Sequence, residues 1–177
     1  MKMSFKTLML GFIASIFFFS CKKHDTNNQE TLNAQDRNFI MQAAMGNTAE
    51  IQAGQLADST ADSSAIKTFA AELVSDHQAA QNDLKSLGTQ VNVNVPDSAD
   101  SNHTMMLDSL RGLTGRAFDS TFLMNQIQDH NQAISDYQAE INSGNKTSVI
   151  KYANQYLPTL QMHLNTADSI ATAMHFK

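Results

Sequence analysis

The sequence lacks many of the residues on which common folds and activities depend. It has no Trp, one Cys, two Pro and seven Gly among 177 residues. A single cysteine cannot form an internal disulfide, and the shortage of Gly and Pro argues against a turn-rich β fold. No Gly-x-Ser-x-Gly motif occurs, so a hydrolase with a serine nucleophile is the least favoured class. The sequence leaves open whether the protein is an enzyme, and favours a protein that is not.

Positive charge is also scarce. The chain has 12 Lys and Arg against 17 Asp and Glu, which gives a formal net charge of −5. A protein that binds nucleic acid needs a basic stripe or patch to contact phosphates, and none is visible here. We therefore expect no nucleic-acid partner. The length is sufficient for one domain with a hydrophobic core.

The N-terminal segment predicts export and attachment to a membrane. Two lysines precede an apolar run at 8–19, which is shorter than the ~20 residues of a membrane-spanning helix. A small residue and then Cys21 follow, which resembles the lipobox of bacterial lipoproteins, although Phe18 replaces the usual Leu. We expect a signal peptide at 1–20 and a lipid on Cys21. The alternative is an uncleaved N-terminal anchor with an incidental cysteine.

The residue after the cysteine indicates where such a lipoprotein resides. In the lipoproteins that this segment resembles, Asp at that position favours the inner membrane, whereas this chain has Lys22. We therefore predict a cell-envelope protein in the outer membrane. Residues 21–32 are polar and without apolar periodicity, which is typical of a flexible tether. The folded domain is expected at 33–177.

Apolar residues recur at helical spacing over most of that domain. The patterns predict an all-α fold, a ferritin-like four-helix bundle with a long crossover between helices two and three. Gly88 is expected to end the second helix, and Gly115 to separate the crossover from the third. The expected long helices are 34–58, 63–87, 120–142 and 147–175, with a short helix at 102–110 in the crossover.

Each long helix places one metal-ligand type of side chain on its apolar stripe. These residues are Glu50, His77, His130 and His163. Imidazole and carboxylate together suit zinc, copper, iron or manganese, so the four residues predict a site for one such ion. Counted from the turns, His130 and His163 lie at nearly the same level, whereas Glu50 is offset from His77 by ~7 Å.

An Asp-His pair occurs in two of the helices, as Asp76 before His77 and Asp129 before His130. Neighbouring residues point ~100° apart on a helix, so each Asp would orient a histidine of another helix. We predict these two carboxylates as supporting groups around the metal, and His103 as an exposed residue. The alternative is a core in which the buried His and Glu side chains only satisfy one another.

Short motifs spread over 34–174 add a family resemblance. They include Asp36-x-x-Phe39, Asp76-His77, Asp129-His130, Leu157-Pro158-x-Leu160 and His163-Leu164. Together they resemble the uncharacterised ferritin-like family called domain of unknown function 4142, whose members are often labelled secreted or outer-membrane proteins. The resemblance implies a four-helix bundle and no established reaction.

The resemblance to ferritins stops at the di-iron site. Ferritins carry Glu-x-x-His on two helices, but the residues three before His77 and His163 are Val74 and Leu160. A mononuclear site, or no metal site, is therefore favoured over a di-iron site. Two functions stay open: an envelope lipoprotein that binds one metal ion, and a non-catalytic structural or interaction lipoprotein.

Overall fold

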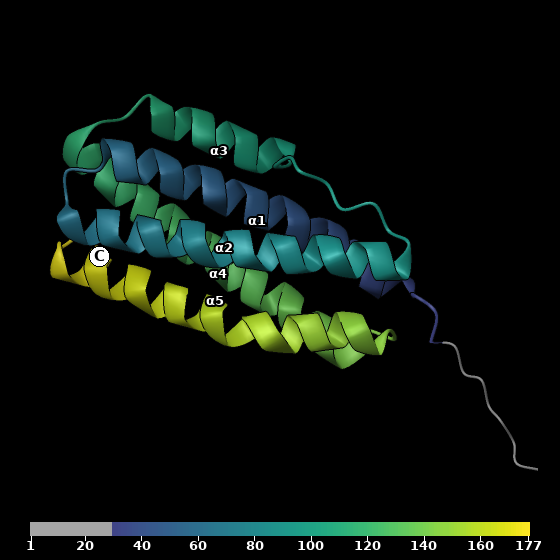
Figure 1. Cartoon of the computed structure of the whole chain (residues 1–177). Helices are drawn as coiled ribbons and strands as arrows, with labels where there is room; N and C mark the ends of the chain where they lie inside the picture. Colours follow the sequence, from purple (N-terminus) through teal and green to yellow (C-terminus); the bar gives the residue numbers. More distant parts are fainter. Residues whose placement is uncertain (1–29) are drawn as a thin grey trace, which may run out of the picture.

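The computed structural model describes residues 30–177, all of whose regular structure is helical (Figure 1). The predicted signal peptide and Cys21 lie outside the described residues. No helix of the described part is long and apolar enough to cross a membrane. The five helices are α1 (Ala34–Thr60), α2 (Ser64–Val91), α3 (Ser101–Arg111), α4 (Gly115–Ser143) and α5 (Thr147–Ala173).

Two predicted helix boundaries are wrong. Helix α2 continues past Gly88 to Val91, and its C-cap Asn92 adopts the left-handed conformation with φ 57°. Gly88 is instead a position where another part of the backbone comes close to the helix, since an added Cβ would lie 2.8 Å from the carbonyl oxygen of Val93. At the other end of the crossover, the third long helix was expected to begin at residue 120. Helix α4 instead begins at Gly115, which has φ 58°.

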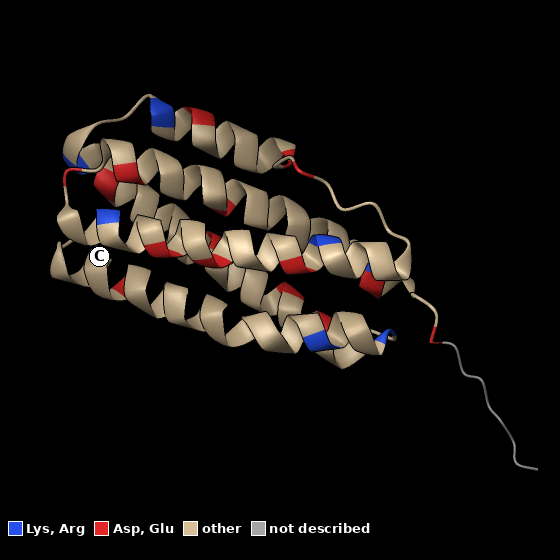
Figure 2. Cartoon of the chain, viewed as in Figure 1, with Lys and Arg blue, Asp and Glu red and all other residues tan. Residues whose placement is uncertain are grey.

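The helices form two antiparallel pairs that pack side by side. Helices α1 and α2 make one hairpin, and α4 and α5 make the other. Helix α1 packs against α4, α2 packs against α5, and α3 lies along α1 on the outside (Figure 1). Lys and Arg lie towards the two ends of the molecule, whereas Asp and Glu also occur along its length (Figure 2).

A buried aspartate from each hairpin holds the turn of the other hairpin. Asp36, in the first turn of α1, forms a capping box with Asn33. Its Oδ1 also accepts hydrogen bonds from the backbone N–H groups of Asn145 and Lys146 at 2.9 and 3.0 Å. In the same way, Asp119 of α4 accepts from the two N–H groups of residues 62 and 63, each at 3.2 Å. Buried carboxylates need such donors to offset the loss of hydration.

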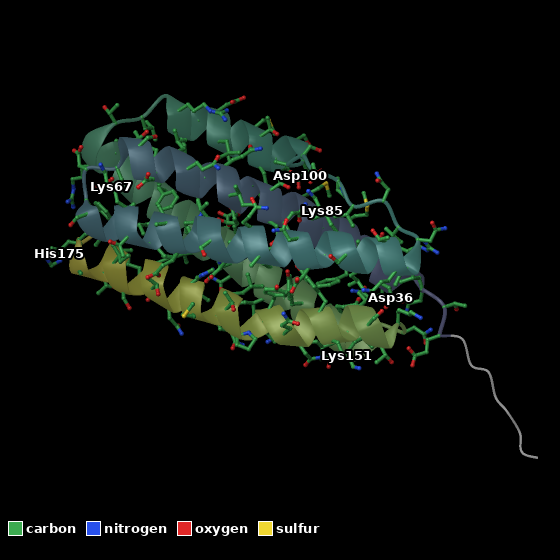
Figure 3. All side chains as sticks on the ribbon, in the orientation of Figure 1. Asp36, Lys67, Lys85, Asp100, Lys151 and His175 are labelled. Carbon is green, nitrogen blue, oxygen red and sulfur yellow. The ribbon has the colours of Figure 1, made fainter. Side chains whose placement is uncertain are left out.

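Asp36 and Lys151 mark one end of the molecule in Figure 3, and Lys67 and His175 mark the other. The described end of the predicted tether contacts the first of these ends. There Glu30 accepts from the backbone N–H and the hydroxyl of Thr147 at 2.9 and 2.6 Å.

The apolar core has two parts with a polar layer between them. One part is rich in phenylalanine, including Phe69, Phe118 and Phe122, and the other contains Phe39 and the tyrosines. The ring of His163 lies edge-on to Phe69, with ring centroids 6.1 Å apart, so the histidine layer borders the phenylalanine cluster directly. The apolar clusters therefore enclose the candidate site from both ends.

Candidate metal centre

Three histidines from three helices meet between the two apolar clusters. His77 of α2, His130 of α4 and His163 of α5 are 5%, 1% and 1% exposed. One ring nitrogen of each lies within 4.8 Å of the others, and the ring centroids are 5.3 to 5.7 Å apart. Each histidine takes a place in the 3–4 spacing of its apolar stripe, which explains why all three point inward.

An amide of α1 fixes the tautomer of His77. Asn47 donates through Nδ2 to Gln81 Oε1 and to the Tyr152 hydroxyl, so its Oδ1 is an acceptor. That oxygen lies 3.0 Å from Nδ1 of His77, and Nδ1 therefore carries the hydrogen. The other ring nitrogen, Nε2, is buried and has no hydrogen-bond partner among residues 30–177. His77 thus presents a free lone pair.

The other two rings are fixed by acceptors in the same manner. Nδ1 of His130 lies 3.0 Å from the carbonyl oxygen of Gln126, which can only accept, so Nδ1 donates. Nε2 of His163 lies 3.0 Å from Oδ2 of Asp76 and donates to that carboxylate. The remaining nitrogens, Nε2 of His130 and Nδ1 of His163, face each other at 3.3 Å.

Burial keeps all three rings neutral at ordinary pH. It lowers the pKa of His130 to about 4, lowers that of His77 well below its usual value, and lowers that of His163 despite the neighbouring Asp76. In each ring, the nitrogen that donates to Asn47, Gln126 or Asp76 is the outer nitrogen, and the other is the inner nitrogen. Because each neutral imidazole has its hydrogen on the outer nitrogen, the lone pair is on the inner nitrogen. The three inner nitrogens therefore form a set of lone-pair donors that can coordinate a single cation.

Glu50 lies beside this set. Its carboxylate oxygen Oε1 is 3.7 Å from Nδ1 of His130, the outer nitrogen of that ring. The side chain is 7% exposed and Oε2 has no hydrogen-bond partner in the described part of the chain. Burial raises the pKa of Glu50 to about 8, so the group is protonated at neutral pH in the metal-free protein.

A cavity of about 120 Å³ adjoins the cluster between α1 and α4, with His77, His130 and Glu50 among its lining residues. Asp129 and His103 line the same cavity and also a larger surface groove. Burial raises the pKa of Asp129, and its Oδ2 has no hydrogen-bond partner within residues 30–177.

The structure brings some of the predicted site residues together and keeps others apart. The three histidines meet, and Asp76 bonds a histidine of another helix, as the sequence suggested. Glu50 is closer to the cluster than its level along α1 indicated, although it faces an outer nitrogen. Asp129 lies in the cavity wall beside the α4 stripe, with no histidine ring within hydrogen-bond range of its Oδ2.

Two features differ from the sequence expectations around this site. His103 is half-buried and contacts Asp100 at 2.9 Å, although we expected it to be exposed. The sequence reasoning also missed Asn47, which orients His77. The signal was present, because Asn47 precedes Glu50 by three residues and so lies on the same face of α1.

Comparison with known proteins supports the fold. A DUF305 fragment from Deinococcus radiodurans has a crystal structure similar to 81% of this chain and 99% of its own, with a TM-score of 0.71 and 11% identity. The structure of CopM in its silver-bound form matches 78% of this chain and 96% of its own, with a TM-score of 0.65 and 16% identity.

No curated protein matches the sequence. The model of the domain of unknown function DUF4142 matches residues 21–170, which is most of the chain and includes the three histidines and their supporting residues. This protein therefore belongs to the DUF4142 family.

Proposed function

We propose that this protein binds a single transition-metal ion through His77, His130 and His163. The observation that carries the proposal is the convergence of three inner nitrogens whose lone pairs are fixed inward by outer hydrogen bonds. Two of these nitrogens lie 3.3 Å apart with no hydrogen between them, which is repulsive unless a cation lies nearby. The same separation, about 3.3 Å, is the edge of a tetrahedron around zinc with Zn–N of ~2.0–2.1 Å.

A purely structural cluster explains the site less well. Buried polar atoms in a core are expected to have hydrogen-bond partners. Nε2 of His77 and Oε2 of Glu50 have none among the described residues, so the His and Glu side chains do not satisfy one another. Two unpaired buried atoms next to a set of lone pairs favour a site that is completed by an ion.

The donor atoms favour zinc or copper among the four metals that the sequence suggested. Imidazole nitrogens suit these ions, whereas manganese prefers oxygen ligands. The similarity to CopM, whose structure contains silver, is in keeping with a metal-binding role. The ion would hold the three rings together, and Glu50, whose Oε1 faces the outer nitrogen of His130, would lie beside the site as a carboxylate once the cation lowers its pKa.

The cellular setting rests on the sequence. We propose a lipid on Cys21, removal of residues 1–20 and placement in the outer membrane, with 21–32 as the tether. We also propose that the four long helices are a ferritin-like four-helix bundle, to which α3 is an addition in the crossover. This arrangement would hold the metal site in the cell envelope.

Metal titration of the purified, metal-free chain tests the proposal. Zinc or copper should bind at one equivalent and raise the melting temperature, since an ion that binds only the native state stabilises it. His130→Ala and His163→Ala should abolish the shift, and His103→Ala, outside the cluster, should retain it. A parent protein whose melting temperature is unchanged by zinc, copper, iron and manganese would overturn the proposal.

The pH at which the metal effect disappears gives a second test. Protons compete with the metal for an imidazole only near or below its pKa in the folded protein. Because burial lowers the pKa of His130 to about 4, the zinc-induced shift should persist at pH 5.5 and decline towards pH 4. Loss of the shift already at pH 6.5, the ordinary range for histidine, would contradict the buried, neutral cluster.

A further inference from the structure

Gly46 lies in the interior of α1 without a packing reason. Glycine weakens a helix interior relative to alanine. A Cβ at this position would meet no atom within 4 Å in the described part of the protein. Gly54, two turns later in the same helix, differs: its Cβ would lie 2.8 Å from the carbonyl oxygen of Ala70 and from Cγ2 of Val74. Close helix packing explains Gly54 but leaves Gly46 unexplained.

The space beside Gly46 is the cavity that adjoins the histidines. Its volume of about 120 Å³ is somewhat smaller than the ~150 Å³ cavity that accepts benzene in a well-studied case. Its polar side includes His77, whose free Nε2 lacks a partner among residues 30–177, and Glu50. The other walls are mostly apolar, formed by Phe39, Ala43, Ala133, Tyr137 and Leu160.

A surface groove between α3 and α4 adjoins this cavity. His103, Asp129, Gln42 and Gln132 line both the cavity and the groove. Asp100 adds a further carboxylate to the groove, and its pKa is lowered despite burial by hydrogen bonds from the backbone and ring of His103. An acidic opening of this kind disfavours anions.

We propose that this cavity is a binding site for a small neutral molecule with a lone-pair donor, which reaches the metal through the groove and completes its coordination. Gly46 leaves the space that this molecule occupies. The inference rests on the proposed function, since the ion supplies the coordination bond, while the mostly apolar walls of the cavity hold the molecule even without the ion. Three protein ligands with one position left for an exogenous ligand are the usual arrangement of a reactive zinc site.

Cobalt(II) and pyrazole provide the test on the whole chain. Cobalt replaces zinc and reports its coordination through visible absorption, and pyrazole is a small neutral ring with one lone-pair nitrogen. In the parent, cobalt should give an absorption spectrum that depends on the three histidines, and pyrazole should change it. Gly46→Leu fills the cavity from α1 and should keep the cobalt spectrum but lose the response to pyrazole.

Two further variants complete the design. Gly46→Ala adds only a methyl group and should retain the pyrazole response, which makes it the matched control. Ala133→Leu fills the cavity from α4 and replaces Gly46→Leu if that variant does not fold. A parent that binds cobalt but ignores pyrazole overturns the ligand site and leaves the metal proposal intact. An unchanged pyrazole response in both filled variants also overturns it.

A metal-free measurement separates the two proposals. The methyl resonances of Ala43 and Ala133, which line the cavity, should shift with pyrazole in the parent and not in Gly46→Leu. If cobalt does not bind at the histidines, the proposed function fails, and these shifts still decide the ligand site. Unshifted methyl resonances in a parent without cobalt binding would overturn both proposals.

Discussion

Glu50→Gln should stabilise the metal-free protein, and the gain should grow with pH. In the folded protein burial raises the pKa of Glu50 to about 8, whereas an exposed glutamate has a value near 4.5. Between these values the unfolded chain releases a proton that the folded chain keeps. Because the unfolded state then binds fewer protons, the stability of the parent falls as pH rises from 4.5 to 8.

The size of the effect follows from the shift in pKa. One pKa unit corresponds to about 1.4 kcal/mol, so at pH 7 the glutamate costs about 3 kcal/mol relative to a group that stays neutral. Glutamine has nearly the same shape and no proton to gain. The stability difference between Glu50→Gln and the parent should therefore be small at pH 4.5 and about 3 kcal/mol at pH 7.

Urea unfolding followed by circular dichroism at pH 4.5, 6 and 7 measures this difference. Glu72→Gln, at an exposed position of α2, is the control. Adding zinc should reduce the advantage of glutamine, because a nearby cation favours the ionised carboxylate. A pH-independent difference would refute the reasoning, since it would mean that Glu50 is ionised in the folded protein.

Further predictions follow from packing and from the N-terminal segment. Gly46→Ala should raise the free energy of unfolding by about 0.5–1 kcal/mol in urea titrations, whereas Gly54→Ala should lower it because its Cβ would overlap a neighbouring helix. Leu73→Ala should cost about 2–5 kcal/mol because the side chain is fully buried, and Ile134→Ala should cost less because it is half-buried; equal losses would contradict this packing. Cys21→Ser should abolish lipid attachment, and unchanged membrane fractionation and mobility would count against the lipobox.

Local patterns predicted the helices and the inward direction of the histidines well, because both depend on residues three and four positions apart. Gly88 shows where such reasoning fails. Its position in the local sequence indicates a helix end. In the structure, however, glycine is required there because the chain after α2 folds back so that Val93 and Val95 lie against residue 88. Only the tertiary path of the chain reveals that contact.

The surroundings of the histidines were harder to predict for the same reason. The level of Glu50 was derived from turn lengths, which ignore how helices slide and tilt against each other when they pack. Asn47 and the backbone carbonyl of Gln126 became tautomer-fixing partners only through side-chain directions that no spacing rule contains. The cavity beside Gly46 likewise depends on the packing of several helices, since its lining residues come from all five.

The reciprocal carboxylates at the two turns have a mechanical consequence. Asp36 ties the α4–α5 turn to the start of α1, and Asp119 ties the α1–α2 turn to the start of α4, so the hairpins are fastened to each other at both ends. Such a molecule resists splaying at either tip. Any opening motion that exposes its interior should then be largest at mid-length, beside α3, and a ligand should reach the histidines from that side of the molecule.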